Sequence, residues 1–137
     1  MNVREVMTPN PIILNRDATA QEAAQQMRDA GVGDVLVQED GSLLGIVTDR
    51  DIVVRVVADG KSAEQTHLGE CCSDQLHTLS PDTDAEEAVQ TMREFAVRRV
   101  PVVENGQAVG IVSIGDLATS REEHSALADI SAAPPNN

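Results

Sequence analysis

A four-residue motif that can hold both a phosphate and a sugar occurs twice in this sequence. The copies are Thr48-Asp49-Arg50-Asp51 and Ser113-Ile114-Gly115-Asp116, and each opens a predicted helix. A Ser or Thr at a helix start leaves backbone N–H groups and the positive end of the helix dipole available to an anion. The Asp at the fourth position can accept hydrogen bonds from both hydroxyls of a ribose. Each motif therefore offers partners for a phosphate and a sugar together.

The same motif also has a purely structural interpretation. Thr48 and Ser113 can serve only as helix caps, and a carboxylate in the first turn is favourable for any helix. The residues of the motif leave both interpretations open.

Other kinds of chemistry have weaker signals. His67, Cys71, Cys72 and His77 are possible ligands of a soft metal such as zinc or copper. Their spacing matches no metal motif, and adjacent cysteines seldom point to one centre, so we predict no metal site. A metal or redox sensor that uses Cys71, Cys72 and His67 stays an alternative. No nucleophile–base arrangement and no phosphate-binding glycine loop is present, so we predict no enzymatic activity.

The two motifs belong to an internal repeat, which tells how they are positioned. A shift of 65 residues aligns residues 3–52 with 68–117 without a gap, and about 18 of the 50 aligned positions are identical. We expect the first repeat at 2–60, the second at 61–119 and a C-terminal tail at 120–137. A unit this small buries little apolar surface alone, so the copies should pack with pseudo-two-fold symmetry.

Each repeat is predicted to be β-α-β-β-α, an α+β fold. Thr19–Glu22 and Asp84–Glu87 are capping-box patterns that begin helices at 20–30 and 85–96. Strands follow at 35–37 and 43–47, and at 100–103 and 108–112, after shorter ones at 12–14 and 78–79. Asp40-Gly41 and Asn105-Gly106 predict tight hairpin turns, because these residues tolerate positive φ.

Composition excludes several classes of protein. The 10 Lys and Arg residues face 23 Asp and Glu residues, for a formal charge of -13, so general nucleic-acid binding is disfavoured. Phe95 is the single aromatic residue, and no apolar stretch approaches the ~20 residues that span a membrane. We found neither a signal-peptide pattern nor a disulfide framework, so we expect a cytoplasmic protein.

The repeated pattern resembles the cystathionine-β-synthase (CBS) domain family, as a stand-alone tandem pair (a Bateman module) over residues 2–118. The resemblance rests on Val6-Met7-Thr8, the capped helices, the run from Val97 to Val103 and both copies of Gly-Ile-Val-Thr/Ser-x-x-Asp. The stretch Thr48–Val53 is similar to small bacterial pairs of the hypoxic response protein type. Membership implies a regulatory module that needs no cofactor and binds an adenosine ligand (AMP, ADP, ATP, S-adenosylmethionine or NAD) in clefts between the repeats, without catalysis.

The resemblance implies two unequal clefts. The first draws on Asn2, Met7, Val32, Gly33, Arg98, Arg99, Ile111, Ser113 and Asp116. The second draws on His67, Cys72, Val97, Arg98, Gly33, Asp34, Ile46, Thr48, Arg50 and Asp51. Arg99 faces phosphate in the first cleft, whereas Asp34 takes that place in the second and repels it. We therefore expect the first cleft to be the better nucleotide site.

Three features depart from the family pattern. Asn2 and His67 stand where many members have Thr, and Cys71-Cys72 replaces the Val-Met of the first copy.

Family members also commonly form homodimers, to which the apolar stretch Ile52–Val57 can contribute. A ligand-free dimerisation scaffold is therefore the remaining alternative, and an unidentified effector protein is a candidate partner.

Overall fold

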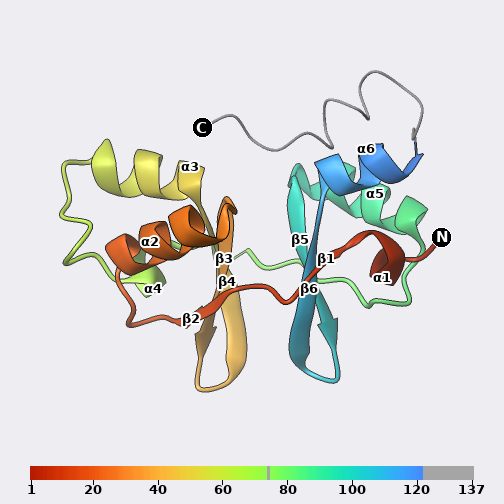
Figure 1. The fold of residues 1–137 in the computed structure, drawn as a ribbon, viewed down its shortest axis with the longest axis horizontal. Helices are drawn as coiled ribbons and strands as arrows, with labels where there is room; N and C mark the ends of the chain where they lie inside the picture. The colour runs from red at the N-terminus through yellow and green to blue at the C-terminus, as the bar shows by residue number, and fades with distance from the viewer. Residues whose placement is uncertain (74, 122–137) are drawn as a thin grey trace. The chain divides into compact units, whose positions relative to one another are not determined.

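The computed structural model describes residues 1–73 and 75–121, and the chain divides into two compact units (Figure 1). Unit 1 comprises Met1–Asn10 and His77–Asn137, and unit 2 comprises Pro11–Leu76. The chain therefore changes units at residues 10 and 76, whereas the sequence repeats meet near residue 60. Each unit thus combines the first segment of one repeat with the remainder of the other.

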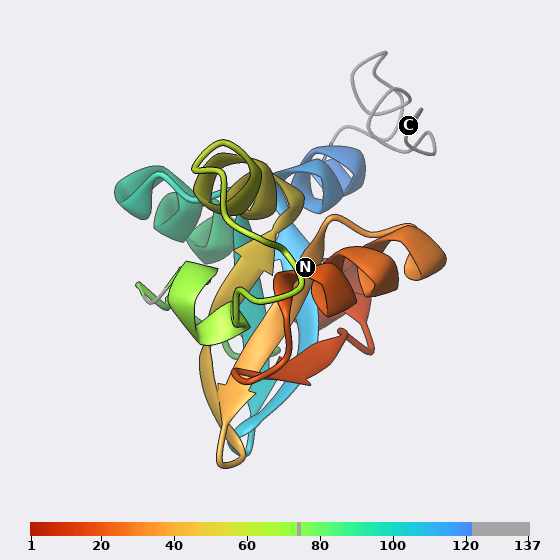
Figure 2. The same cartoon turned by 90° about the vertical axis from the view of Figure 1, so that its left-hand side faces the viewer.

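Unit 2 is a three-stranded sheet whose order is β2-β3-β4. β2 (Ile13–Asn15) pairs parallel with β3 (Asp34–Glu39), and β3 pairs antiparallel with β4 (Ser42–Thr48). Figure 2 shows α2 (Ala20–Ala30) and the short α4 (Leu68–Cys71) beside the β3–β4 hairpin. After β4 the chain enters α3 (Asp49–Ile52), which continues as a π-helix, η1 (Val53–Val57).

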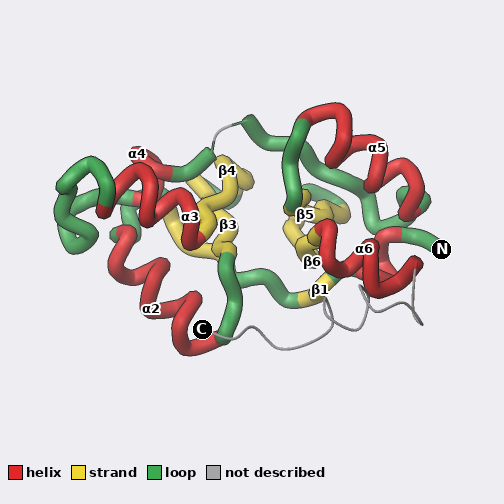
Figure 3. The backbone as a smooth tube through the Cα atoms, turned by 90° about the horizontal axis from the view of Figure 1, so that it is seen from above, coloured by secondary structure: helices red, strands yellow, loops and turns green. Residues whose placement is uncertain are grey.

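Unit 1 repeats this arrangement with small differences. Its sheet has the order β1-β6-β5, and β1 (Thr8–Pro9) and β5 (Arg99–Glu104) both run antiparallel to β6 (Gln107–Ser113). Its helices are α1 (Val3–Val6), α5 (Ala85–Phe95) and α6 (Ile114–Arg121), and Figure 3 shows α5 and α6 beside β5 and β6. No helix in the described part of the chain is both long and apolar enough to span a bilayer.

The predicted α+β class and the order of the main elements are confirmed. Both hairpins turn through the predicted residue pairs, with φ of 50° and 79° at Asp40 and Gly41 and of 53° and 76° at Asn105 and Gly106. Such positive φ values at two consecutive positions define the type I′ turn, whose twist matches that of the strands. Local turn chemistry therefore sets the register of both hairpins.

Two local predictions differ from the structure, and two short helices were not predicted. Thr19 and Glu22 form the expected capping box, but Asp84 accepts from the N–H of Glu86, so no box with Glu87 forms. The strand expected at 78–79 is reduced to a single bridge between Leu79 and Val102. The helices α1 and α4 were not expected, because four residues are too few to show helical periodicity. The part of the predicted tail at 122–137 lies outside the described residues.

Each unit is completed by a crossing segment, the stretch that comes from the start of the other repeat. In unit 1 this segment is Met1–Asn10, and its strand β1 places Thr8 opposite Ile111 in β6. In unit 2, Ser73 takes the same position and exchanges backbone hydrogen bonds with Ile46 (2.9 and 3.4 Å). A Cβ on Gly45 would lie 2.0 Å from the Ser73 carbonyl oxygen. Glycine is therefore required where the crossing segment touches β4.

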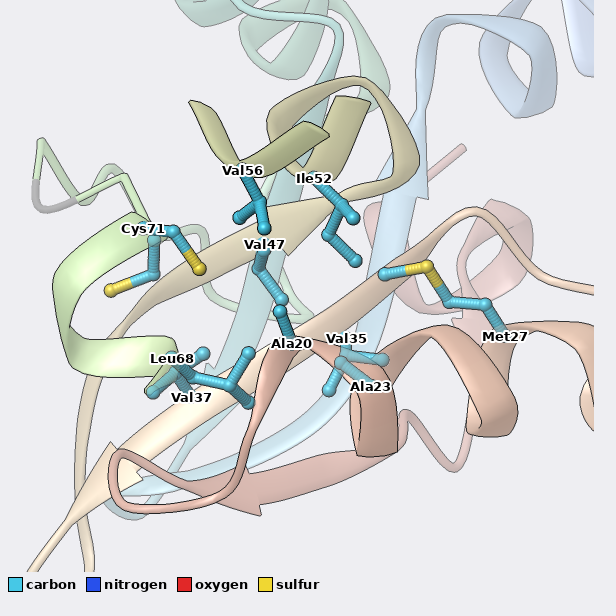
Figure 4. Packing of buried hydrophobic residues seen from close by; sticks show 11 residues of the cluster. Ala20, Ala23, Met27, Val35, Val37, Val47, Ile52, Val56, Leu68 and Cys71 are labelled. Carbon is cyan, nitrogen blue, oxygen red and sulfur yellow. The ribbon is translucent and has the colours of Figure 1, made fainter. Parts of the chain in front are cut away.

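Each unit has its own apolar core. In unit 2, side chains from α2, the β3–β4 hairpin, α3, η1 and α4 meet, as Figure 4 shows for Ala23, Val35, Val47, Val56 and Leu68. In unit 1, the corresponding cluster is Val3, Leu79, Ala85, Ala88, Met92, Val100, Val102, Val112 and Leu117. Because Val3 and Leu68 belong to the crossing segments and are completely buried, neither core is complete without the exchange.

Candidate functional site

The two predicted ligand motifs adopt nearly the same geometry at the ends of β4 and β6. Oδ2 of Asp51 accepts from the backbone N–H of Thr48 (2.9 Å), while the Thr48 hydroxyl accepts from the N–H of Asp51 (3.1 Å). In unit 1, Asp116 and Ser113 make the same reciprocal pair at 2.9 and 3.0 Å. Ser and Thr thus do cap the helices, as the structural interpretation requires.

Helix capping uses only one of the two carboxylate oxygens of Asp51 and Asp116. Each backbone bond reaches Oδ2 of the aspartate, and a carboxylate has acceptor capacity on both oxygens. Both side chains are partly buried, so they are held in place yet reachable from solvent. Asp51 and Asp116 can therefore cap a helix with one oxygen and accept a ligand hydroxyl with the other.

The strand opposite each motif carries a residue of different charge in the two units. Arg99, the first residue of β5, pairs with Ser113 across the hairpin, whereas Asp34, the first residue of β3, pairs with Thr48. An additional backbone bond fixes each helix start, from Asp49 N–H to Gly33 O (3.0 Å) and from Ile114 N–H to Arg98 O (2.9 Å). The register thus places a cation beside one motif and a carboxylate beside the other.

The crossing segments bring further predicted residues to each motif. In unit 1, Thr8 pairs with Ile111, and Met7 packs so closely on Gly110 that a Cβ there would lie 2.6 Å from its Sδ. In unit 2, the buried Cys72 contacts Gly45, with its Sγ 3.3 Å from where a Cβ would stand. Met7 and Cys72 therefore occupy equivalent positions, against Gly110 of β6 and Gly45 of β4, on the strands that lead into the two motifs.

Two predicted residues at the starts of the crossing segments act as helix caps. Asn2 begins α1, and its side chain accepts from the N–H of Glu5 (3.3 Å). His67 begins α4, and its N–H donates to the Glu70 carboxylate (2.8 Å) while its ring is 55% exposed. These contacts give Asn2 and His67 structural roles, and their ligand contacts stay predictions.

The remaining predicted residues divide between the units. Val32 and Gly33, assigned to the set around Asp116, belong to unit 2, and Val97, assigned to the set around Asp51, belongs to unit 1. Arg50 and Arg98 are exposed, and Ile46 lies on β4 beside Ser73. Each motif is therefore surrounded, within its own unit, by only part of its predicted set.

The cysteine pair is buried at the end of α4. Cys71 is the last residue of the helix and Cys72 its C-cap, and their exposed fractions are 2% and 8%. Burial raises the pKa of the Cys71 thiol, and the neighbouring Cys72 and Asp51 act in the same direction. Among residues 1–73 and 75–121, no three or more His, Cys, Asp or Glu side chains gather closely enough to hold a metal ion.

Arg55 is a residue that the sequence predictions missed. Its Nη1 donates to the carbonyl oxygens of Cys71 (3.2 Å) and Cys72 (3.3 Å), and its Nε lies 4.0 Å from Oδ1 of Asp51. The available signal was a single charge inside the apolar run Ile52–Val57.

Comparison with known proteins agrees with this geometry. A sequence profile described as the CBS domain matches residues 3–58 and again residues 68–123. The CBS domain-containing protein YhcV of Bacillus subtilis is 38% identical over 134 residues, which cover 95% of each chain. Hypoxic response protein 1 of Mycobacterium tuberculosis is 33% identical over 122 residues, which cover 88% of this chain and 85% of that protein.

Solved structures are similar over the same range. A protein with CBS domains from Burkholderia ambifaria matches with a TM-score of 0.83 and 26% identity, over 91% of this chain and 96% of that one. Hypoxic Response Protein I, whose crystal structure contains two coordinated zinc ions, matches with a TM-score of 0.75 and 31% identity, over 88% and 98% of the two chains.

Proposed function

Because this chain belongs to the CBS-domain family, we propose that it is a regulatory module that binds an adenosine-containing ligand at the capped motifs Ser113–Asp116 and Thr48–Asp51. The observation that carries the proposal is the aspartate geometry. In each motif one carboxylate oxygen is held by the backbone and the other can accept from a ribose hydroxyl. Proteins of this family are generally regulatory and without catalysis of their own.

The charges around the motifs favour the one in unit 1. Arg99 lies across the hairpin from Ser113 and supplies a cation on the side where a phosphate would meet the start of α6. Asp34 occupies the equivalent place beside Thr48, where its negative charge opposes an anionic ligand. We therefore propose that Ser113–Asp116 binds AMP, ADP or ATP more tightly, and that Thr48–Asp51 binds more weakly or accepts less anionic ligands.

Thermal unfolding with and without ligand tests the proposal. AMP, ADP, ATP, S-adenosylmethionine and NAD are each added to the parent protein and to Asp116→Ala, Asp51→Ala and Asp82→Ala. The Asp82 side chain is 80% exposed and lies outside both motifs, so it controls for the loss of one carboxylate. A ligand at ~100 times its Kd adds ~2.7 kcal/mol, a rise of several degrees.

The expected result is a rise with at least one ligand that Asp82→Ala retains, Asp116→Ala reduces strongly and Asp51→Ala reduces only slightly. Each rise is measured against the ligand-free variant, because loss of the carboxylate also weakens the cap. Equal losses in Asp116→Ala and Asp51→Ala would contradict the preference for unit 1. If none of the five ligands raises the midpoint of the parent, the proposal of a nucleotide sensor fails.

We also propose that the chain forms a homodimer through the exposed side of η1. The apolar stretch divides into two sides, since Ile52 and Val56 pack into the core, whereas Val53, Val54 and Val57 are 57%, 46% and 63% exposed. Adjacent exposed valines favour association because their burial removes apolar surface from water. Sedimentation equilibrium should give a dimer for the parent and a monomer for Val57→Glu. A monomeric parent would contradict this proposal.

A further inference from the structure

One corner of unit 2 differs from its counterpart in unit 1 in three ways. The helix after Asp51 becomes a π-helix at Val53–Val57, whereas α6 continues as an α-helix after Asp116. Arg55 lies four residues after Asp51, where Ser120 follows Asp116. The crossing segment carries Cys71-Cys72 in place of Val6-Met7. These differences coincide in space, because the Arg55 side chain contacts the backbone at both cysteines.

The backbone of η1 and the core account for the direction of Arg55. The N–H of Ala58 bonds to Val53 O (2.8 Å), and that of Lys61 bonds to Val56 O (2.9 Å), both at the i→i+5 spacing of a π-helix. Val56 is completely buried in the unit 2 core. With Val56 fixed there, the adjacent Arg55 lies at the edge of the core and reaches the end of α4.

Arginine suits this position for two reasons. The carbonyls of Cys71 and Cys72 lie at the C-terminal end of α4, where backbone acceptors lack partners within the helix and the dipole favours a cation. The guanidinium also presents several donors in a rigid fork, so Nη1 can serve the carbonyls while Nε faces Asp51. Arg55 thus links the Asp51 carboxylate to the crossing segment.

We propose that Arg55 is a positioning residue that fixes the Cys71–Cys72 segment relative to the Asp51 carboxylate, and so sets the distance between the sugar-binding and base-binding parts of the unit 2 site. The proposal rests on the proposed function, in which Asp51 accepts from the ribose, and it takes Cys72, which packs against Gly45, as the residue that meets the base. Its consequence is specific. Loss of Arg55 weakens ligands that need both parts and spares ligands that need only the sugar part.

The first experiment measures the link itself and needs no ligand. In the parent, the N–H of Cys72 bonds to Leu68 O and that of Ser73 to Ile46 O, both at 2.9 Å. Hydrogen exchange by mass spectrometry in a peptide spanning residues 68–73 should be roughly tenfold faster in Arg55→Ser, the size expected for a lost hydrogen bond to a charged group. Arg28→Ser removes the same charge from the exposed surface of α2 and should leave this exchange unchanged.

The second experiment measures binding in an Asp116→Ala background, where AMP can use only the Asp51 motif. Calorimetric titration compares AMP with ribose 5-phosphate, which lacks the base, before and after Arg55→Ser. We expect AMP to bind five- to tenfold more weakly and ribose 5-phosphate to change less than twofold. Arg55→Lys keeps the charge without the fork and should resemble Arg55→Ser.

The outcomes separate this proposal from the proposed function. Equal weakening of both ligands, or an Arg55→Lys variant that matches the parent, would mean that Arg55 acts only through its charge and would overturn the positioning role. Unchanged exchange in Arg55→Ser would overturn the link. If Asp116→Ala binds no AMP while the parent does, Arg55 has no role in a nucleotide site. If the parent binds none of the five ligands, the proposed function fails, and the exchange result alone decides whether Arg55 holds the segment.

Discussion

Replacing Gly45 by Ala should separate the crossing segment of unit 2 from its sheet. The added Cβ would stand 2.0 Å from the Ser73 carbonyl oxygen and 3.1 Å from the carbonyl carbon. Both contacts are with backbone, so no side-chain rotation relieves them. The Ser73 carbonyl has to retreat by roughly 1.4 Å to reach an ordinary contact distance.

The size of the effect follows from what that retreat breaks. The two hydrogen bonds between Ile46 and Ser73 are lost, at about 0.5–1.5 kcal/mol each, and overpacking adds about 1–3 kcal/mol. The intrinsic preference for Ala over Gly within a strand returns only about 0.5–1 kcal/mol. The clash therefore dominates, and we expect a net loss of about 2–4 kcal/mol in the free energy of unfolding.

Urea denaturation of a glycine series measures this loss. Gly110→Ala should lower the free energy of unfolding by less, about 1–2 kcal/mol. The Cβ added there would stand 2.6 Å from Met7 Sδ, which is flexible and can move away, and 2.8 Å from the Thr8 carbonyl oxygen. Gly115→Ala is the control, since its Cβ would meet only Ser113 Oγ at 3.6 Å and Ala stabilises a helix. With a typical urea m-value, the Gly45→Ala midpoint should fall by about 1–2 M.

The order of the three variants is the decisive result. If Gly45→Ala unfolds at the parent's midpoint, or is less destabilising than Gly110→Ala, the close passage of the crossing segment over β4 is wrong. Faster hydrogen exchange confined to the segment at residues 68–73 would locate the damage where the clash is expected.

Three further predictions concern single positions. Ala96 ends α5 with φ of 53°, at the position where Gly31 ends α2. Because glycine adopts this left-handed backbone without strain, Ala96→Gly should raise the free energy of unfolding, measured in urea, by about 0.5–1 kcal/mol. A lower free energy of unfolding in Ala96→Gly would mean that Ala96 is not strained. Ser113→Ala removes the cap of α6 and should lower the thermal midpoint by the equivalent of about 1 kcal/mol, whereas an unchanged midpoint would mean that the cap contributes nothing. Because the pKa of Cys71 is raised in the fold, the unfolded thiol ionises first as pH rises past about 8.5, so stability should fall above that pH. Urea midpoints at pH 7.5 and 9.5 should show a smaller fall in Cys71→Ala, and an identical fall in both proteins would refute this assignment.

Much of the local structure could be predicted because its causes are local. Asp40-Gly41 and Asn105-Gly106 tolerate the two positive φ values of a type I′ turn whatever surrounds them. The reciprocal bonds of Thr48 with Asp51 join residues only three positions apart. The repeat itself then indicated that each such feature would occur twice.

Some features were beyond prediction because they depend on packing. The four-residue helices α1 and α4 show too little periodicity to be detected, and they exist because Val3 and Leu68 are buried in their cores. The π-helix at Val53–Val57 has no local signal either, since the same valines would suit an α-helix or a strand.

The repeat, the hairpin turns, the Thr19–Glu22 capping box and the two Asp-containing motifs could be found from the residues alone, because each turn, cap and motif involves residues close together along the chain. The contacts between residues far apart along the chain emerged only from the folded structure. It set Ser73 against Gly45 and Arg55 against the carbonyls of Cys71 and Cys72. Such contacts form because a segment distant in sequence packs into an apolar core, and the spacing of neighbouring residues does not show which core that will be.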